Sequence, residues 1–324
     1  MLSSSDHILI LGGTGLFGHH LLPRLLLQHN VSSDFPRISL VTRSASNAVK
    51  SFPYLKSFAN IIECDFLHCN RLEMVTDCTH ILHMATTSAR DTYSGVNQFS
   101  KFELLLNSAY AVRDIILRGG VKKVVFASSG VAYGSPARYI ESTPSVVSHL
   151  QLSSSLMLGK ITAEFILYDA CITSQVHYSI ARLFSFVSPF LPCDIHYAIG
   201  NFVRDAIQNK DIVIRSDGKD MRSYQHLEDA IDWILSLVLL DRAPLVLNIG
   251  SDESLSIRDL ALRVKYLTNS SSAIRILNNN VSDDNARRSN YIPDISLARS
   301  LGLENTISLN DSIVELARFV SANA

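Results

Sequence analysis

The chain has 324 residues, 47% of them hydrophobic, with 29 lysines and arginines against 30 aspartates and glutamates. This length allows one large α/β unit or two coupled domains with a sizeable core. The formal net charge of −1 creates no basic field for nucleic acid or an anionic membrane surface, so we expect neither as a partner.

Cysteine usage and the apolar runs indicate the compartment. The five cysteines are scattered and include no Cys-x-x-Cys pair, which argues against a disulfide framework and a structural zinc site. The first apolar run breaks at Gly12, too early for a signal-peptide core. The run over residues 234–240 is far shorter than the ~20 residues needed to cross a bilayer. We therefore expect a cytoplasmic protein without a transmembrane helix.

Short apolar runs alternate with helical segments in the first half of the chain. The pattern predicts strands over residues 7–11, 38–41, 61–63, 80–84, 124–127 and 179–186. It predicts helices over residues 16–28 and 102–118 and another that begins near residue 155. This alternation is typical of an α/β fold with a doubly wound parallel sheet, the Rossmann arrangement.

Beyond residue 186 the pattern loosens, which predicts a smaller C-terminal lobe. Its expected elements are helices over 201–208, 227–240 and 257–268, strands over 212–214 and 246–249, and a final helix from residue 311. We assign residues 1–183 to the Rossmann domain and residues 184–324 mainly to a substrate-binding lobe. Segments near 222–250 are expected to return to the first domain.

A glycine-rich loop joins the first predicted strand to the first predicted helix. Gly12, Gly15 and Gly18 enclose Leu16 and Phe17 in the run Leu-Gly-Gly-Thr-Gly-Leu-Phe-Gly. Glycine permits a tight turn and lets backbone N–H groups approach a pyrophosphate, while the helix that follows directs its positive end at the same anion. These residues therefore predict the phosphate-binding turn of NAD(P).

The choice between NAD and NADP depends on the end of the second strand. A carboxylate usually binds the adenosine ribose there, but this chain has Thr42 and Arg43. An arginine can pair with a 2′-phosphate, so NADP(H) is slightly favoured over NAD(H). The alternative interpretation, that Arg43 is only a solvated surface residue, has nearly equal weight. Asp65, after the third strand, is expected either to accept from the adenine amine or to stabilise a turn.

Several spaced motifs resemble the extended short-chain dehydrogenase/reductase family, which contains NAD-dependent sugar-nucleotide epimerases, dehydratases, decarboxylases and reductases. The glycine loop matches the family's Gly-x-x-Gly-x-x-Gly pattern, and the resemblance covers nearly the whole chain. Further matches are Asp65 with Phe66, His83 to Ala85 followed by Thr86, and Ser128, Ser129, Tyr133 and Gly134 in a Ser-Ser-x-x-x-Tyr-Gly stretch. The resemblance implies that Asp65, Phe66, Ala85 and Thr86 line the cofactor site.

The resemblance also implies a substrate site and a dimer. Arg222 lies in a segment like the family's Gly-Asp-Gly-x-x-x-Arg-Asp-Phe pattern and would hold a substrate phosphate, a role suited to its forked donors. Arg288 lies where a second phosphate-binding arginine is expected, although a surface role is equally open. Asn201 and Ser129 complete the expected substrate-binding set. Relatives commonly pair through two helices, here 102–118 and 155–168, so a homodimer is expected.

The expected catalytic centre lacks one residue of the family pattern. Family members use Ser/Thr with Tyr-x-x-x-Lys, in which lysine binds the nicotinamide ribose and lowers the tyrosine pKa for proton transfer. Ser129 and Lys160 match, and Glu164 follows Lys160 as in the family, but Leu156 stands where tyrosine is expected. Three explanations stay open. Another side chain supplies the proton, the cofactor is held and cycled by a second substrate, or the protein is catalytically silent.

Tyr139, His149 and Tyr93, in nearby loops, are the candidates to replace the tyrosine as proton carrier. Gly130 and Val131 occupy the positions where the family's dehydratases carry an Asp-Glu pair, which disfavours a 4,6-dehydratase. The histidines show no metal-ligand spacing, so no metal is predicted.

The resemblance implies hydride transfer at a ring carbon of a nucleoside-diphosphate sugar, as an NAD(P)-dependent oxidoreductase or epimerase in polysaccharide or glycoconjugate biosynthesis. The alternatives are an NAD(P)-binding sensor or scaffold without turnover and, less favoured, a dehydratase or decarboxylase with an unusual base.

Overall fold

The computed structural model describes residues 2–69, 71–87, 95, 97–134, 136, 138–145, 154–195, 197–277 and 290–323. The chain divides into two compact units. Unit 1 comprises Met1–Gly134, Pro144–Leu183 and Ile231–Leu247. Unit 2 comprises Ser135–Thr143, Phe184–Ala230 and Asn248–Ala324.

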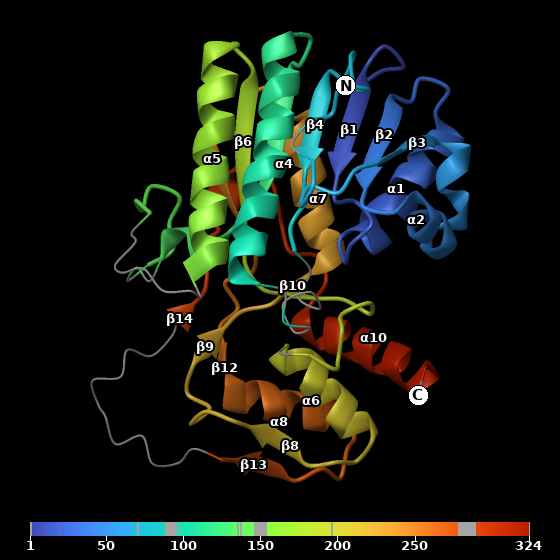
Figure 1. Ribbon diagram of the computed structural model, residues 1–324. Helices are drawn as coiled ribbons and strands as arrows, with labels where there is room; N and C mark the ends of the chain where they lie inside the picture. The colour runs from blue at the N-terminus through green and yellow to red at the C-terminus, as the bar shows by residue number, and fades with distance from the viewer. Residues whose placement is uncertain are drawn as a thin grey trace. The chain divides into compact units, whose positions relative to one another are not determined.

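A seven-stranded sheet forms the centre of unit 1 (Figure 1). Its strands are β1 (His7–Leu11), β2 (Arg37–Thr42), β3 (Ala59–Glu63), β4 (His80–His83), β5 (Lys123–Ser129), β6 (His177–Leu183) and β11 (Val246–Ile249), in the order β11-β6-β5-β4-β1-β2-β3. The pairs from β3 through β6 are parallel. This is the predicted doubly wound α/β fold.

The strand order reverses between β1 and β4, which makes this the position where open α/β sheets bind ligands. From β1 the chain moves outward to β2 and β3, and from β4 it moves the other way to β5 and β6. Leu11 pairs with His83, so both strands end at the same level. The segments that follow β1 and β4, and therefore the glycine loop, leave the sheet at this reversal.

Helices cover the sheet because its central strands are buried on both faces. All five residues of β1 are buried. Leu9 and Leu11 belong to a core that also contains Val112 of α4 (Gln98–Arg118) and Leu167 of α5 (Ser155–Thr173). Helices α4 and α5 run side by side along the sheet (Figure 1).

The remaining helical segments of unit 1 follow the strands. They are α1 (Gly18–Val31), α2 (Ala45–Ser51), the 3-10 helices η1 (Pro53–Ser57) and η2 (Gly130–Tyr133), and the greater part of α7 (Leu227–Leu239). Helix α1 begins at Gly18, two residues later than predicted, because Gly18 N–H donates to Gly15 O in a turn before the helix. It continues through Pro23 to Val31, three residues beyond the predicted end.

Unit 2 contains short strands and a group of packed helices. The strands pair as β7 (Phe186–Val187) with β10 (Gln225–His226), β8 (Ile212–Ile214) with β13 (Ile274–Ile276), and β9 (Met221–Arg222) between β12 (Leu255–Ser256) and β14 (Asn290–Tyr291). The helices are α6 (Ala198–Ile207), α8 (Ile257–Leu267), α9 (Ser296–Ser300) and α10 (Leu309–Ala322).

Buried apolar side chains join α6, α8 and α10, among them Phe202, Val264 and Leu316. Helix α10 begins before the predicted Asp311 because Ser308 caps it and its Oγ accepts from Asp311 N–H at 3.1 Å. The helices in the described part of the chain include none that could span a membrane.

Candidate functional site

The glycine loop combines two tightly packed glycines with one open position. Gly12 has φ +78°, and a Cβ there would lie 2.6 Å from the backbone of Ala85. At Gly18 a Cβ would lie 1.9 Å from Gly13 O, so the close packing of the first residue of α1 on the loop before it requires glycine. Gly15 is different, since its Cβ would meet nothing nearer than Gly12 O at 3.7 Å. Gly15 is exposed, and its missing side chain leaves room for the close approach of a dinucleotide pyrophosphate.

Thr42 and Arg43 lie beside the loop at the end of β2. Thr42 is buried, and its Oγ1 lies 3.3 Å from Thr14 Oγ1 in the glycine loop. Arg43 is exposed, and Ser44 after it caps α2 by accepting from Asn47 N–H at 3.3 Å. This edge can therefore reach the adenosine end of a cofactor held at the glycine loop.

Residues after β3 and β4 complete the expected cofactor contacts. Asp65 Oδ1 accepts from Leu67 N–H at 3.0 Å, so this carboxylate stabilises its own turn, and Phe66 is buried in the core. Ala85 packs against Gly12, and Thr86 is exposed. The turn role of Asp65 is established, whereas contacts of these four residues with adenine or the cofactor stay predictions.

Lys160 is buried beneath the end of β5. Its Nζ donates to Ala127 O at 2.6 Å and lies 4.8 Å from the ring centroid of Phe126. Burial lowers the pKa of Lys160 to about 8, although the carboxylate of Glu164 opposes the shift. Both interactions fix the ammonium group close to the end of β5, two residues before Ser129.

His83 adds a second buried nitrogen group near Lys160. Its Nδ1 accepts from Ala85 N–H at 3.3 Å, and its ring packs edge-on against Phe126. Burial, with a smaller contribution from the positive charge of Lys160, lowers the pKa of His83 to about 3. His83 is therefore neutral at physiological pH. Its Nε2 is buried and has no hydrogen-bond partner within the described ranges.

The position of the family's tyrosine falls on the first turn of α5. Leu156 is half-buried there, one helical turn before Lys160, and Ser155 beside it donates from Oγ to Gln98 Oε1 at 2.7 Å. A leucine has no ionisable proton, so this turn can position apolar atoms but cannot act as acid or base. Ser129, the other predicted catalytic residue, caps η2, with its Oγ accepting from Val131 N–H at 3.3 Å.

A buried ion pair, missed in the sequence, stabilises the same region. Arg182 on β6 contacts both oxygens of Glu164, with Nη2 to Oε2 at 2.7 Å and Nε to Oε1 at 3.2 Å. Ser128 Oγ also donates to this carboxylate, and the guanidinium lies 4.2 Å from the ring centroid of Tyr133. The sequence feature that could have indicated this ion pair is the position of Arg182 inside the apolar run over residues 179–186. This network fixes α5 against the ends of β5 and β6.

Unit 2 holds the predicted phosphate-binding arginine. Arg222 lies on β9, and its Nη1 donates to Met221 O at 2.8 Å. Burial raises the pKa of Tyr139 and raises that of Tyr224 to about 12. The positive charge of Arg222 acts in the opposite direction on both phenols. Both phenols are therefore close to Arg222 and protonated at neutral pH.

Other predicted residues have structural partners or lie outside the described part of the chain. Tyr139 packs edge-on against Phe184 and Tyr291, at centroid distances of 5.5 and 5.4 Å. Asn201 donates from Nδ2 to Ile195 O at 2.6 Å. Arg288, His149 and Tyr93 lie outside the described residues.

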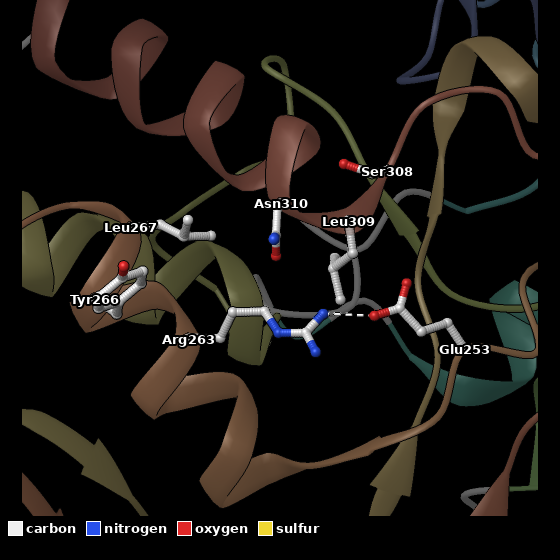
Figure 2. Close-up of a pocket in the computed structure, with 7 residues that line it drawn as sticks. All are labelled: Glu253, Arg263, Tyr266, Leu267, Ser308, Leu309 and Asn310. Carbon is white, nitrogen blue, oxygen red and sulfur yellow. Dashed lines mark hydrogen bonds and ion pairs between the residues drawn. The ribbon is translucent and has the colours of Figure 1, made fainter.

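A separate groove of about 330 Å³ opens on unit 2 (Figure 2). It lies between the end of α8 and the start of α10, and an ion pair of 2.5 Å between Arg263 and Glu253 crosses it. None of the predicted site residues lines this groove. Where side chains are described, no group of three or more His, Cys, Asp or Glu residues is arranged to hold a metal ion.

Comparisons with known proteins agree with this fold. The model of the NAD dependent epimerase/dehydratase family matches residues 8–250. UDP-glucuronic acid decarboxylase 5 of Arabidopsis thaliana is 24% identical over 314 residues, which cover 96% of this chain and 88% of the relative.

Solved structures of similar fold include UDP-glucose 4-epimerase of Thermotoga maritima with UDP-glucose, at a TM-score of 0.78 and 19% identity, covering 98% of this chain and 99% of that one. Another is dTDP-glucose 4,6-dehydratase of Bacillus anthracis with NAD, at a TM-score of 0.78 and 17% identity, covering 98% and 97%. The family match spans well over half of the chain. The chain belongs to the NAD-dependent epimerase/dehydratase family.

Proposed function

We propose that unit 1 binds a nicotinamide dinucleotide at the glycine loop and that the protein oxidises or reduces a ring carbon of a nucleoside-diphosphate sugar. The observation that carries the proposal is the difference among the three glycines, because Gly12 and Gly18 satisfy packing whereas Gly15 leaves space for a ligand. The bound dinucleotide would accept the hydride when the ring carbon is oxidised and donate it when the ring carbon is reduced. Epimerisation follows if the hydride returns to the opposite face of the ring.

The site residues have separate roles in this proposal. Lys160, held by Ala127 O, donates to the nicotinamide ribose, and Ser129 at the end of β5 binds the sugar hydroxyl. Arg222 and Asn201 bind the substrate, the former through its phosphate. UDP is the favoured nucleotide, because the names of the Arabidopsis relative and the Thermotoga epimerase both contain UDP-sugars.

Two other functions are each favoured by one observation. Leu156 favours a protein that binds the dinucleotide without turnover, because no acid or base occupies the first turn of α5. The similarity to UDP-glucuronic acid decarboxylase 5 favours a decarboxylase, in which oxidation of the ring carbon precedes loss of CO₂. In both enzymatic cases the proton must move through a group other than residue 156.

Incubation of the protein with NAD or NADP and a panel of UDP-sugars tests the proposal. Turnover should appear as a nicotinamide absorbance change at ~340 nm, or as an epimer without net absorbance change, so products are also separated by chromatography. Lys160→Ala and Ser129→Ala should each abolish turnover. Activity that survives both substitutions, or failure to bind every dinucleotide and UDP-sugar, would contradict the proposed site.

The decarboxylase alternative has its own assay. UDP-glucuronic acid labelled at the carboxylate should release labelled CO₂ if the protein is a decarboxylase. Binding of the dinucleotide, with no epimer, redox product or CO₂ from any sugar, would favour the silent binding protein.

We also propose that α4 and α5 pair with a second copy of the chain. Helix α5 carries apolar residues at the 3-4-3-4 spacing of a coiled-coil seam, namely Leu158, Ile161, Phe165, Tyr168 and Ile172, of which the last three are exposed. Its charged residues Lys160 and Glu164 are buried, which leaves Asp169 on its outer surface. An exposed apolar face of this length on a helix favours its burial against another chain, which here would be a second copy of the protein.

A further inference from the structure

The adenosine edge of the proposed cofactor site contains a carboxylate that the sequence pattern does not place there. In the sequence, β2 ends in Thr42 and Arg43, without the acid that commonly binds the ribose. In the structure, β3 pairs in parallel with β2, and Thr42 is the register partner of Glu63. Glu63 therefore lies at the same edge of the sheet as the missing acid would.

The Glu63 side chain turns toward the segment that follows β2. Its Oε2 accepts from the N–H of Ala45, the first residue of α2, at 2.7 Å. The residue is exposed, so its second carboxylate oxygen can accept a hydrogen bond from a ligand. The side chain thus supplies an acceptor next to Thr42 and Arg43, taken from the neighbouring strand.

The start of α2 is also occupied in a way that disfavours a phosphate. The N–H of Ala45 donates to Glu63, and the N–H of Asn47 donates to Ser44 Oγ at 3.3 Å. These backbone donors are the groups that an anion at this position would need. A 2′-phosphate would have to displace them and approach the Glu63 carboxylate, whereas a 2′-hydroxyl would donate to it.

We propose that Glu63 binds the adenosine ribose of the cofactor and makes this chain select NAD over NADP. The proposal rests on the proposed dinucleotide site and reverses the preference expected from Thr42 and Arg43 alone. The link between Thr14 and Thr42, with 3.3 Å between the two Oγ1 atoms, connects this edge to the glycine loop, so both ends of the adenosine diphosphate are bound by neighbouring segments.

Calorimetric titration of the full chain with NAD and with NADP tests the assignment without relying on turnover. We expect the wild-type protein to bind NAD at least about tenfold more tightly than NADP, the effect of one charge-assisted hydrogen bond replaced by repulsion. Glu63→Gln should reduce that ratio by about tenfold. Its amide oxygen can still accept from Ala45 N–H, so the start of α2 and the melting temperature should be preserved.

Glu73→Gln is the matched control. This glutamate is exposed in unit 1, with Arg71 3.7 Å away, and its substitution should leave the NAD to NADP ratio unchanged. Arg43→Ala tests the rival residue directly: it should leave the preference for NAD in place, and a change in the ratio in this variant but not in Glu63→Gln would assign the preference to Arg43. Tighter binding of NADP by the wild-type protein, or a ratio that Glu63→Gln leaves unchanged, would overturn the role of Glu63 while the proposed cofactor site stands. Failure of both dinucleotides to bind would overturn that site as well.

Discussion

The glycine loop and the first turn of α5 differ in how far they fit the chemistry of this family. In the loop, the packing at Gly12 and Gly18 permits only glycine, and Gly15 leaves open space. In α5, the buried Lys160 is held in place, but Leu156 one turn earlier cannot transfer a proton. We therefore expect dinucleotide binding and proton transfer to be separable in this chain, with the first depending on the glycine loop and the second lacking its usual residue on α5.

The largest effect on stability is expected from substitutions in the glycine loop. Gly18→Ala places Cβ 1.9 Å from Gly13 O, so α1 must shift, and we expect a loss of at least about 3 kcal/mol in the free energy of unfolding. Gly15→Ala should change stability by less than about 1 kcal/mol yet weaken NAD binding more than tenfold. Denaturant unfolding and calorimetry measure the two quantities. Equal stability losses in both variants would contradict the separate roles of these glycines.

Lys160→Met tests the corresponding lysine in α5. Methionine removes a buried ammonium group whose pKa is lowered to about 8, so the variant should lose nicotinamide binding without loss of thermal stability. In the wild-type protein, burying the charged ammonium group lowers the free energy of unfolding, and this loss is complete below pH 8. It decreases as the pH rises toward the ordinary lysine pKa of about 10.5, because the folded protein then holds the amine in its neutral form. The stability gain of the variant over wild type should therefore be larger at pH 7 than at pH 9.5. A lower melting temperature at pH 7 would contradict this account.

His83 predicts a smaller effect at acid pH. Because burial holds its folded-state pKa near 3, below the ordinary value of 6.5, the unfolded chain binds the proton more readily and stability falls as the pH drops from about 6.5 to 3. His83→Asn can still accept from Ala85 N–H and should flatten the stability profile in this range.

Asp6 gives a separate reference for the acid profile. Burial acts to raise the pKa of Asp6, but hydrogen bonds from Lys122 and the backbone of Ser3, with the positive charge of Lys122, outweigh it and lower the pKa to about 2. Its contribution is present above the unfolded value near 3.8 and is lost as the pH falls toward 2. Asp6→Asn should therefore alter the profile mainly below pH 4. An unchanged slope between pH 6.5 and 4 in His83→Asn would contradict the role given to His83.

The outer face of α5 predicts the smallest effect on the folded chain. Phe165→Glu adds a charge to the proposed seam and should convert a dimer to a monomer, with less than about 1 kcal/mol change in the stability of the chain itself. Sedimentation measures the mass. Asp169→Asn is the control on the same surface. A wild-type protein that is monomeric at every concentration would contradict the dimer.

Local sequence pattern predicted the elements whose residues act nearby in the chain. The strand predicted over residues 7–11 is β1, because four consecutive apolar residues, 8–11, end directly at Gly12, and the glycine loop follows as expected. The network of Arg182, Glu164 and Ser128 could not be predicted in this way, since its members come from three elements brought together by folding. The same reason concealed Glu63, whose partner Ala45 lies on another element.

Calorimetric titration of the wild-type chain with NAD, beside Gly15→Ala, tests most directly the claim that the cofactor half of the site is retained. Our account predicts saturable binding of one NAD per chain, at least tenfold weaker in Gly15→Ala although both proteins unfold at similar denaturant concentration. No binding by the wild-type chain, or equal binding by both proteins, would contradict it.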